Sequence, residues 1–271
     1  MIKGAVLGSP ISHSLSPLLH TSAFDFLGVE GTYTSIEVKS GELAAFLSEE
    51  NEISQSFDYF SLTMPLKEEL VRLNVRRDPL AVRIQSANTL FRSGSEWMAT
   101  STDGSGFLQV LSDVSPDQLR KTLILGAGGT ARAVADALDS VSEHIHVMGR
   151  SHAREEAMTS CITRAEFTFL SWQDAIDFEF YDLIVNTTPA GAADVLISKV
   201  PRKIRAIYFD VLYKPLPTPL AAVWRDHGGR VYDGIDLLVY QGIDQLDLIL
   251  DLGSSHNELA MYLEKVLRNS L

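Results

Sequence analysis

The chain has 271 residues, of which 23 are Lys or Arg and 35 are Asp or Glu, so its formal net charge at pH 7 is −12. An acidic surface repels phosphate groups, which disfavours a nucleic-acid-binding protein. Hydrophobic residues make up 45% of the chain and charged residues 21%, a balance that allows a buried core and excludes intrinsic disorder. This length favours two domains over one.

Cys161 is the only cysteine in the sequence, so no intramolecular disulfide and no cysteine-based metal site can form, and we expect no bound metal. The stretch from Met1 to Gly8 has too short an apolar run for a secretory signal. No run of about 18 apolar residues could span a membrane. We therefore expect a cytoplasmic protein with neither a membrane nor a nucleic-acid partner.

Short apolar runs alternate with segments of helical period in the first hundred residues, which is typical of an α/β fold. The pattern predicts strands over residues 4–7, 33–38, 59–62 and 88–91, and helices over 17–27, 41–50 and 65–73. Ser16 is the expected N-cap of the first helix, with Pro17 at its first position and Gly28 at its end.

A second α/β unit begins with an apolar strand over residues 122–125, followed by a glycine-rich turn and a helix over 130–138. Further strands over 145–148, 167–170, 183–185 and 204–209 predict a doubly wound sheet of Rossmann type. Helical patterns over 235–252 and 257–267 follow without a linker, so we expect these helices to return to the first unit. The expected domains are 1–103 with 236–271, and 104–235.

The glycine-rich turn fits the pattern G-x-G-x-x-A between a strand and a helix. Its residues are Gly126, Ala127, Gly128, Gly129, Thr130 and Ala131. The first glycine permits the tight turn, the second lets the backbone approach a pyrophosphate, and the alanine allows close helix packing. The pattern favours dinucleotide binding. The alternative is a tight turn between strand and helix whose small residues serve only packing.

Arg150 and Ser151 follow the next strand, about where an NAD site would carry an acidic residue. A guanidinium beside a hydroxyl suits a 2′-phosphate, and Arg154 lies one helical turn further on. The sequence therefore favours NADP. Alternatively, both arginines are solvated and pair with Glu155 or Glu156.

Three polar features of the first unit are candidates for binding or catalysis. In an extended loop Ser14 and Ser16 would point the same way and could grip a carboxylate, although Ser16 could simply cap a helix. Lys67 in the first turn of a helix opposes the helix dipole, at a cost of about 0.3–1 kcal/mol, and such violations occur at functional sites. Asp103 precedes a predicted helix and could cap it or face a substrate.

Taken together and in chain order, these motifs resemble the shikimate dehydrogenase family, whose members reduce 3-dehydroshikimate with NADPH. The matching strings cover the length of the chain: 14–17 (Ser-Leu-Ser-Pro), 61–67 (Ser-Leu-Thr-Met-Pro-Leu-Lys), 88–89 (Asn-Thr), 102–104 (Thr-Asp-Gly), 126–129, 149–151 (Gly-Arg-Ser), 186–191 (Asn-Thr-Thr-Pro-Ala-Gly), 210–215 (Asp-Val-Leu-Tyr-Lys-Pro), Gly234 and Gln241.

The resemblance implies an NADP-dependent oxidoreductase of aromatic amino-acid and chorismate biosynthesis, acting on a small-molecule substrate as a monomer or homodimer. It implies that Lys67 and Asp103 are the catalytic pair, and that domain 1–103 with 236–271 binds substrate while domain 104–235 binds NADP. The implied substrate ligands are Ser14, Ser16, Ser61, Thr63, Asn88, Tyr213 and Gln241. The implied cofactor ligands are Gly126, Ala127, Gly128, Gly129, Thr130, Ala131, Gly149, Arg150, Ser151, Arg154, Thr187, Thr188, Pro189, Leu212 and Gly234.

Two positions depart from the family pattern and keep other functions open. Ser61 replaces an Asn that bonds a substrate hydroxyl, and Gly149 replaces the Asn before Arg150. A paralogue that acts on quinate with NAD is therefore one alternative. A dinucleotide sensor without catalysis and a folate-type methylene dehydrogenase are two others.

Overall fold

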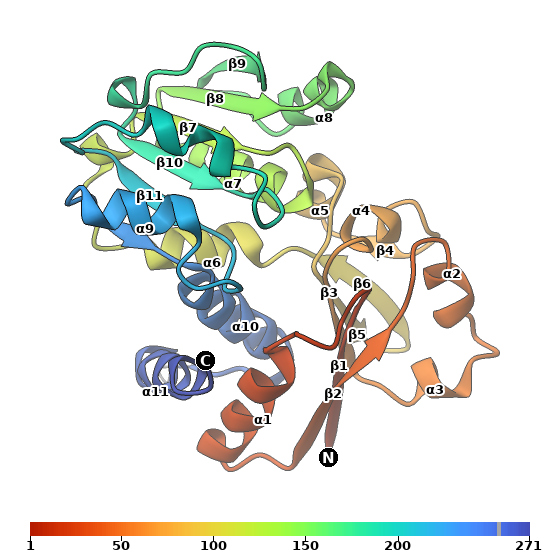
Figure 1. Cartoon of the computed structure of the whole chain (residues 1–271). Coiled ribbons are helices and arrows are strands. Elements are labelled where there is room, and N and C mark those ends of the chain that lie inside the picture. Colours follow the sequence, from red (N-terminus) through yellow and green to blue (C-terminus); the bar gives the residue numbers. More distant parts are fainter. Residues whose placement is uncertain (254–255) are drawn as a thin grey trace. The chain divides into compact units, whose positions relative to one another are not determined.

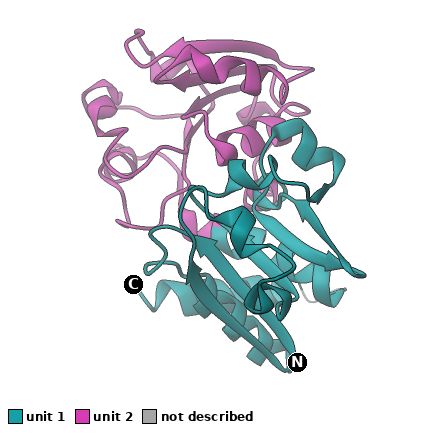
Figure 2. Cartoon of the chain, turned by 90° about the vertical axis from the view of Figure 1, so that its right-hand side faces the viewer, with its two compact units in different colours: residues 1–106, 238–271 teal, residues 107–237 magenta. Residues whose placement is uncertain are grey.

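The structure is a computed structural model that describes residues 1–253 and 256–271. These residues form two compact units, one of 1–106 with 238–271 and the other of 107–237 (Figure 2). Both boundaries fall inside helices, α6 (Asp103–Val110) and α10 (Gly234–Leu250). The unit that contains residues 1–106 thus also contains most of α10 and the described residues after it.

The first unit is built on a six-stranded mixed sheet in the order β2-β1-β3-β5-β6-β4 (Figure 1). β1 pairs in parallel with β2 and β3, whereas β5 is antiparallel to β3 and β6. Its elements are β1 (Ile2–Gly8), α1 (Ser16–Leu27), β2 (Gly31–Glu37), α2 (Leu43–Phe46), α3 (Glu52–Gln55), β3 (Tyr59–Leu62), α4 (Lys67–Leu70), β4 (Arg76–Arg77), α5 (Pro79–Ile84), β5 (Thr89–Ser93), β6 (Glu96–Thr100), most of α10, and α11 (His256–Arg268).

Several local predictions for this unit are correct and others are not. Gly28 ends α1 in the left-handed conformation at φ 64°. Ser16 is not the N-cap of α1: it is the first helical residue, and Leu15 is the cap. The helices expected over 41–50 and 65–73 are single helical turns in the structure. One turn is enough to bury the apolar side chains of these segments, such as Leu43, Leu66 and Leu70.

Two glycines let helices of the first unit approach one another closely. A Cβ on Gly106 of α6 would lie 2.5 Å from the backbone nitrogen of Gln241 in α10. A Cβ on Gly242 would lie 2.8 Å from Leu19 of α1. These approaches hold α10 against α6 and α1, and so position the polar residues that α10 carries.

The second unit is a parallel sheet in the order β12-β11-β10-β7-β8-β9, which is the strand order of a doubly wound dinucleotide-binding fold. The order reverses between β7 and β10, and ligands bind such sheets at the carboxyl ends of the strands beside that point. The elements are β7 (Lys121–Leu125), α7 (Gly129–Leu138), β8 (His144–Gly149), α8 (Glu155–Thr159), β9 (Glu166–Ser171), β10 (Leu183–Asn186), β11 (Ile207–Asp210), α9 (Pro219–Asp226) and β12 (Val231–Tyr232), with short 3-10 turns between them.

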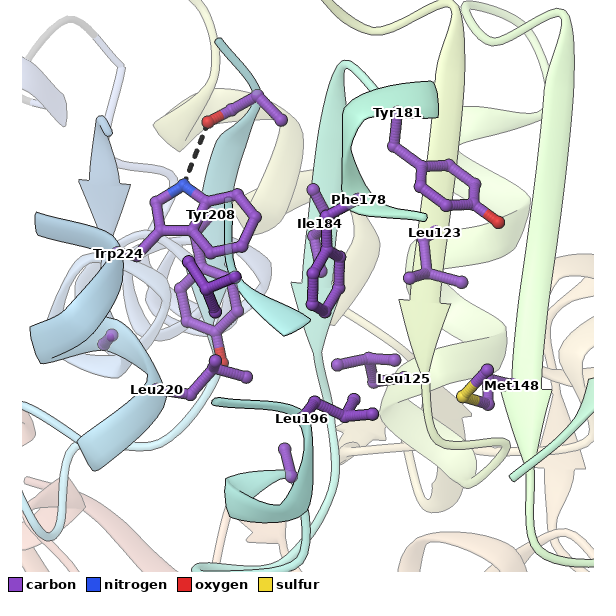
Figure 3. Packing of buried hydrophobic residues seen from close by; sticks show 14 residues of the cluster. Leu123, Leu125, Met148, Phe178, Tyr181, Ile184, Leu196, Tyr208, Leu220 and Trp224 are labelled. Atoms are coloured by element: carbon purple, nitrogen blue, oxygen red, sulfur yellow. Dashed lines mark hydrogen bonds between the residues drawn. The ribbon is translucent and has the colours of Figure 1, made fainter. Parts of the chain in front are cut away.

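The core of the second unit packs large side chains between the sheet and α9 (Figure 3). Trp224 is fully buried, stacks on Tyr208 at 5.3 Å between ring centroids, and donates from Nε1 to the carbonyl oxygen of Ala206 at 3.0 Å. Its polar group is therefore satisfied inside the core.

None of the helices in residues 1–253 and 256–271 is long and apolar enough to cross a bilayer.

Replacing Trp224 by Phe should lower the free energy of unfolding by about 2–3 kcal/mol, because it leaves a cavity and removes the hydrogen-bond donor of the Ala206 carbonyl. Urea denaturation measures this change. Trp97→Phe is the matched control, since Trp97 Nε1 is buried without a hydrogen-bond partner among the described residues. Equal losses in the two variants would contradict the role given to the Trp224 hydrogen bond.

Candidate active site

Lys67 and Asp103 form an ion pair within the first unit. Lys67 begins α4 and Asp103 begins α6, and Nζ lies 2.5 Å from Oδ2. The Lys67 side chain is 18% exposed and that of Asp103 5%. The sequence placed these residues 36 positions apart, and the fold brings their charged groups into direct contact.

The surroundings of Lys67 correct one part of the sequence interpretation. α4 is a single turn, so a helix dipole is too small to govern this amine. The Glu69 carboxylate accepts from the backbone nitrogens of Gly41 and Leu43. The carboxylate of Asp103 is in direct contact with the Lys67 ammonium.

Asn88 joins this pair to Gln241, a third predicted substrate residue. Its Nδ2 donates to Asp103 Oδ1 at 2.8 Å and to Gln241 Oε1 at 3.1 Å, while its Oδ1 accepts from the backbone nitrogen of Thr102 at 2.8 Å. Gln241 Nε2 in turn donates to the Leu238 carbonyl at 2.9 Å. Lys67, Asp103, Asn88 and Gln241 are therefore one connected cluster, which sequence spacing could not establish.

Ser61 lies near the end of β3, and its hydroxyl forms hydrogen bonds with two other side chains. It accepts from the Tyr33 hydroxyl at 2.5 Å and donates to Gln245 Oε1 at 2.6 Å. The sequence analysis missed Gln245, which is fully buried. A signal was present, because Gln241 and Gln245 are four residues apart in an apolar helix and so share a face.

The serine loop does not have the geometry expected from the sequence. Leu15 takes a right-handed helical conformation, and Ser14 Oγ accepts from the Ser16 backbone nitrogen at 3.3 Å. The extended loop that would aim both hydroxyls the same way is therefore wrong, because the helix begins at Ser16. Thr63 follows β3, and its backbone nitrogen donates to the Leu7 carbonyl at 2.9 Å.

The glycine-rich turn of the second unit fits the pyrophosphate of a dinucleotide. Gly126 has φ 104°, and a Cβ there would lie 2.5 Å from Thr187 Oγ1. A Cβ on Gly128 would meet no atom within 4 Å, and α7 begins after Gly128 with no side-chain cap on its amide groups. Ala127, Gly129 and Thr130 complete the turn, and Ala131 is fully buried against the sheet. Open space and uncapped amides are what an anion requires.

Asp210 ties two further loops of the second unit together. Its buried carboxylate accepts from the Thr218 hydroxyl at 2.6 Å and from the Leu212 backbone nitrogen at 3.1 Å, and it also accepts from Asn186. Burial raises the pKa of Asp210, and these hydrogen bonds oppose the rise. The carboxylate thus fixes the segment that leads to Leu212 and Tyr213.

Asn186 and Gly234 shape the rest of this region. Asn186 Oδ1 accepts from the Thr188 backbone nitrogen at 3.1 Å, and Thr187 Oγ1 donates to the Leu125 carbonyl at 2.8 Å, so the chain before exposed Pro189 is held to the sheet. Gly234 donates to the Leu212 carbonyl at 3.1 Å, and a Cβ on it would lie 2.4 Å from the Leu212 carbonyl carbon. Only glycine allows that approach.

The segment after β8 explains the departure at Gly149. A Cβ there would lie 2.5 Å from Phe169 Cζ, so this chain has exchanged a side chain at position 149 for an aromatic ring on β9. Ser151 Oγ accepts from the Ala153 backbone nitrogen at 3.2 Å. Arg150 and Arg154 are exposed. In the described part of the chain, no group of three or more His, Cys, Asp or Glu side chains could hold a metal ion.

Comparisons with known proteins agree with these motifs. A family model described as the shikimate dehydrogenase substrate binding domain matches residues 6–90. A curated shikimate dehydrogenase (NADP(+)) of Exiguobacterium sibiricum is 32% identical over 248 residues, covering 90% of this chain and 90% of that protein. The chain belongs to the shikimate dehydrogenase family.

Solved structures of the family resemble the whole chain. The shikimate dehydrogenase of Mycobacterium tuberculosis has a TM-score of 0.84 at 30% identity, covering 98% of this chain and 100% of that one. An enzyme of the family from Thermus thermophilus, solved in complex with NADP(H) and shikimate, has a TM-score of 0.82 at 29% identity over 100% of both chains. The two-domain α/β fold with a Rossmann-type unit is thus the fold of the family.

A buried histidine lies behind the Ser61 position. His20 stacks on Tyr33 at 4.0 Å between ring centroids, and its Nδ1 lies 2.8 Å from the Tyr59 hydroxyl. Burial lowers the pKa of His20 to about 3, so the ring is uncharged in the folded protein at neutral pH. Burial also raises the pKa of Tyr33.

His20 should therefore make the protein less stable in acid. Its pKa rises from about 3 in the folded chain to an ordinary 6.5 on unfolding, so unfolding takes up a proton below pH 6.5. That proton lowers the free energy of unfolding by up to about 1.4 kcal/mol per pH unit. His20→Phe keeps the ring stack and removes the titration. The free energy of unfolding of the wild type minus that of the variant, measured by urea titration, should therefore fall steadily from pH 7 to pH 4. A difference that does not change with pH would contradict this.

Proposed function

We propose that this chain catalyses the reversible NADP-dependent reduction of 3-dehydroshikimate to shikimate, in the pathway to chorismate and the aromatic amino acids. The observation that carries the proposal is the Lys67–Asp103 pair held by Asn88 and Gln241, in a chain of the shikimate dehydrogenase family. The relatives named above are shikimate dehydrogenases, which favours this function over a quinate-specific or sensor protein.

In this proposal Lys67 and Asp103 handle the proton of the reaction. NADPH supplies the hydride that reduces the ring ketone. The carbonyl oxygen gains negative charge as the hydride arrives and must be protonated, and Lys67 Nζ is the group that stabilises this charge and donates the proton. Asp103 holds the ammonium in place through the 2.5 Å contact of Oδ2 with Nζ. In the reverse direction the same pair accepts the proton from the hydroxyl.

The remaining predicted ligands hold the substrate by its polar groups. Ser14 and Ser16 would bind the carboxylate by the family resemblance, with Ser16 at the start of α1 and not in an extended loop. Asn88 and Gln241 are the predicted ligands of ring hydroxyls, and Gln241 Nε2 carries a second hydrogen besides the one that it donates to the Leu238 carbonyl. Ser61, Thr63 and Tyr213 complete the predicted set.

The second unit would bind NADP. The uncapped amides at the start of α7 suit the pyrophosphate, and the loops around Thr187, Thr188, Pro189, Leu212 and Gly234 would lie along the nicotinamide side. Exposed Arg150, Ser151 and Arg154 would bind the 2′-phosphate, with Gly149 packed under them on Phe169. A cytoplasmic location and a monomeric or homodimeric state stay predictions from the sequence.

Lys67→Met should lower kcat for 3-dehydroshikimate reduction by about 10²–10⁴-fold, because the general acid is lost. Its dissociation constant for NADPH should stay within about twofold, since the uncapped turn is in the other unit. Absorbance of the reduced nicotinamide and fluorescence titration measure the two quantities. Lys39→Met is the control for losing one exposed charge in the same unit and should keep wild-type kinetics. Normal turnover in the Lys67 variant would refute the mechanism.

Arg150→Ala should raise the KM for NADPH by about 10- to 100-fold and leave the KM for NADH nearly unchanged, because a guanidinium–phosphate contact is charge-assisted. Arg164→Ala removes another exposed arginine of the second unit and should change neither constant. Steady-state kinetics with shikimate and quinate and both cofactors make the measurement. A wild-type preference for NAD would show that Arg150 has been misinterpreted.

A further inference from the structure

A continuous line of buried polar groups runs from Tyr33 to the predicted catalytic cluster. Tyr33 donates to Ser61 at 2.5 Å, and Ser61 donates to Gln245 Oε1 at 2.6 Å. Gln245 Nε2 donates to Thr89 Oγ1 at 2.9 Å, and Thr89 donates to Asn88 Oδ1 at 2.8 Å. All five side chains are buried, and all lie in the first unit.

The direction of every hydrogen bond in this line follows from the backbone. The Thr102 backbone nitrogen can only donate, so the Asn88 atom that faces it at 2.8 Å must be the oxygen. The Asn88 nitrogen therefore faces Asp103. Because Thr89 Oγ1 lies against the Asn88 oxygen, the Thr89 hydroxyl must use its proton there and can only accept from Gln245.

The amide of Gln245 is fixed by the same reasoning. Its nitrogen faces two acceptors, Thr89 Oγ1 and the Asn88 carbonyl oxygen at 3.3 Å, so its oxygen faces Ser61. Ser61 must donate its one proton to that oxygen. The Tyr33 hydroxyl then donates to Ser61, and burial raises the pKa of Tyr33, which keeps the proton in place.

We propose that Gln245 and Thr89 are positioning residues for the reaction, which hold the Asn88 amide with its nitrogen toward Asp103. This inference rests on the proposed function. A reversed Asn88 amide would set its oxygen against the Asp103 carboxylate and its nitrogen against the Thr89 hydroxyl and the Thr102 backbone nitrogen. The Asn88 oxygen and the Asp103 carboxylate would then be two acceptors in contact, and the Asn88 nitrogen and the Thr102 nitrogen two donors in contact. Both contacts are strongly unfavourable in a buried site. The line thus maintains the partner that keeps Asp103 aligned with Lys67.

The same line assigns Ser61 to the positioning set. Its proton goes to Gln245, so it has none to donate to a substrate hydroxyl. In this chain the Ser61 position therefore works through Gln245 and Asn88. Ser61, which stands where the family pattern has Asn, and Gln245 are thus joined by one hydrogen bond in this chain.

Two substitutions of Thr89 separate positioning from packing. Thr89→Val keeps the shape and removes the hydroxyl, whereas Thr89→Ser keeps the hydroxyl and removes a buried methyl group. We expect Thr89→Val to lower kcat for 3-dehydroshikimate by about three- to tenfold, the size of one net hydrogen bond, with an unchanged KM for NADPH. Thr89→Ser should keep the wild-type kcat. A Ser variant slower than the Val variant would assign Thr89 to packing and overturn the inference.

Ser54→Ala is the control for losing a buried hydroxyl elsewhere in the first unit. Ser54 is fully buried, and its hydroxyl donates to the Asn51 carbonyl at 3.0 Å, away from the line. This variant should lose stability and keep its kinetic constants. If Thr89→Val does not fold, Gln245→Met cuts the line at its centre and should lower kcat in the same range, and wild-type kcat in that variant would overturn the inference.

The two proposals fail in different ways. A wild-type protein that does not reduce 3-dehydroshikimate with NADPH refutes the proposed function and the inference with it. An active wild type whose Thr89→Val variant keeps full kcat refutes the inference alone. Reduced kcat in Thr89→Val, retained kcat in Thr89→Ser and a constant KM for NADPH together support it.

Discussion

The contact between Lys67 and Asp103 is the interaction on which the rest of the site depends. A carboxylate that is only 5% exposed is costly to bury unless opposite charge and hydrogen-bond donors surround it. The ammonium of Lys67 provides the charge, and the Asn88 amide provides a donor on the other carboxylate oxygen. Lys67 begins α4, Asp103 begins α6 and Asn88 directly precedes β5, so the cluster forms only where these three segments are packed together.

Buried amides give this site its rigidity. Asn88 and Gln245 each have donors and acceptors on opposite sides, and a single orientation satisfies both. The second unit uses the same device with different residues, because Asp210 and Asn186 collect hydrogen bonds from the loops that follow β10 and β11. In the second unit these hydrogen bonds hold the loops that are proposed to bind NADP.

Sequence patterns predicted the elements whose local signals are strong. β3 has the predicted bounds, Gly28 ends α1, and the glycine-rich turn lies between β7 and α7. Weak local signals failed where packing overrode them. α2 and α4 are single turns, Ser16 is helical, and α5 was missed although Asp78 caps it before Pro79. In the site, Gln245 was missed because a buried glutamine in an apolar helix has a meaning only when its neighbours are known.

The sequence by itself determined the family and the doubly wound unit, because these depend on residue order and on periodic burial, and the family resemblance pointed to Lys67 and Asp103 as a pair. Only the tertiary structure decided which atoms meet. The direction of the Asn88 amide, the engagement of the Ser61 hydroxyl by Tyr33 and Gln245, and the packing of Phe169 over Gly149 join residues that are far apart along the chain. Such contacts depend on distances of a few tenths of an ångström, which residue order alone does not specify.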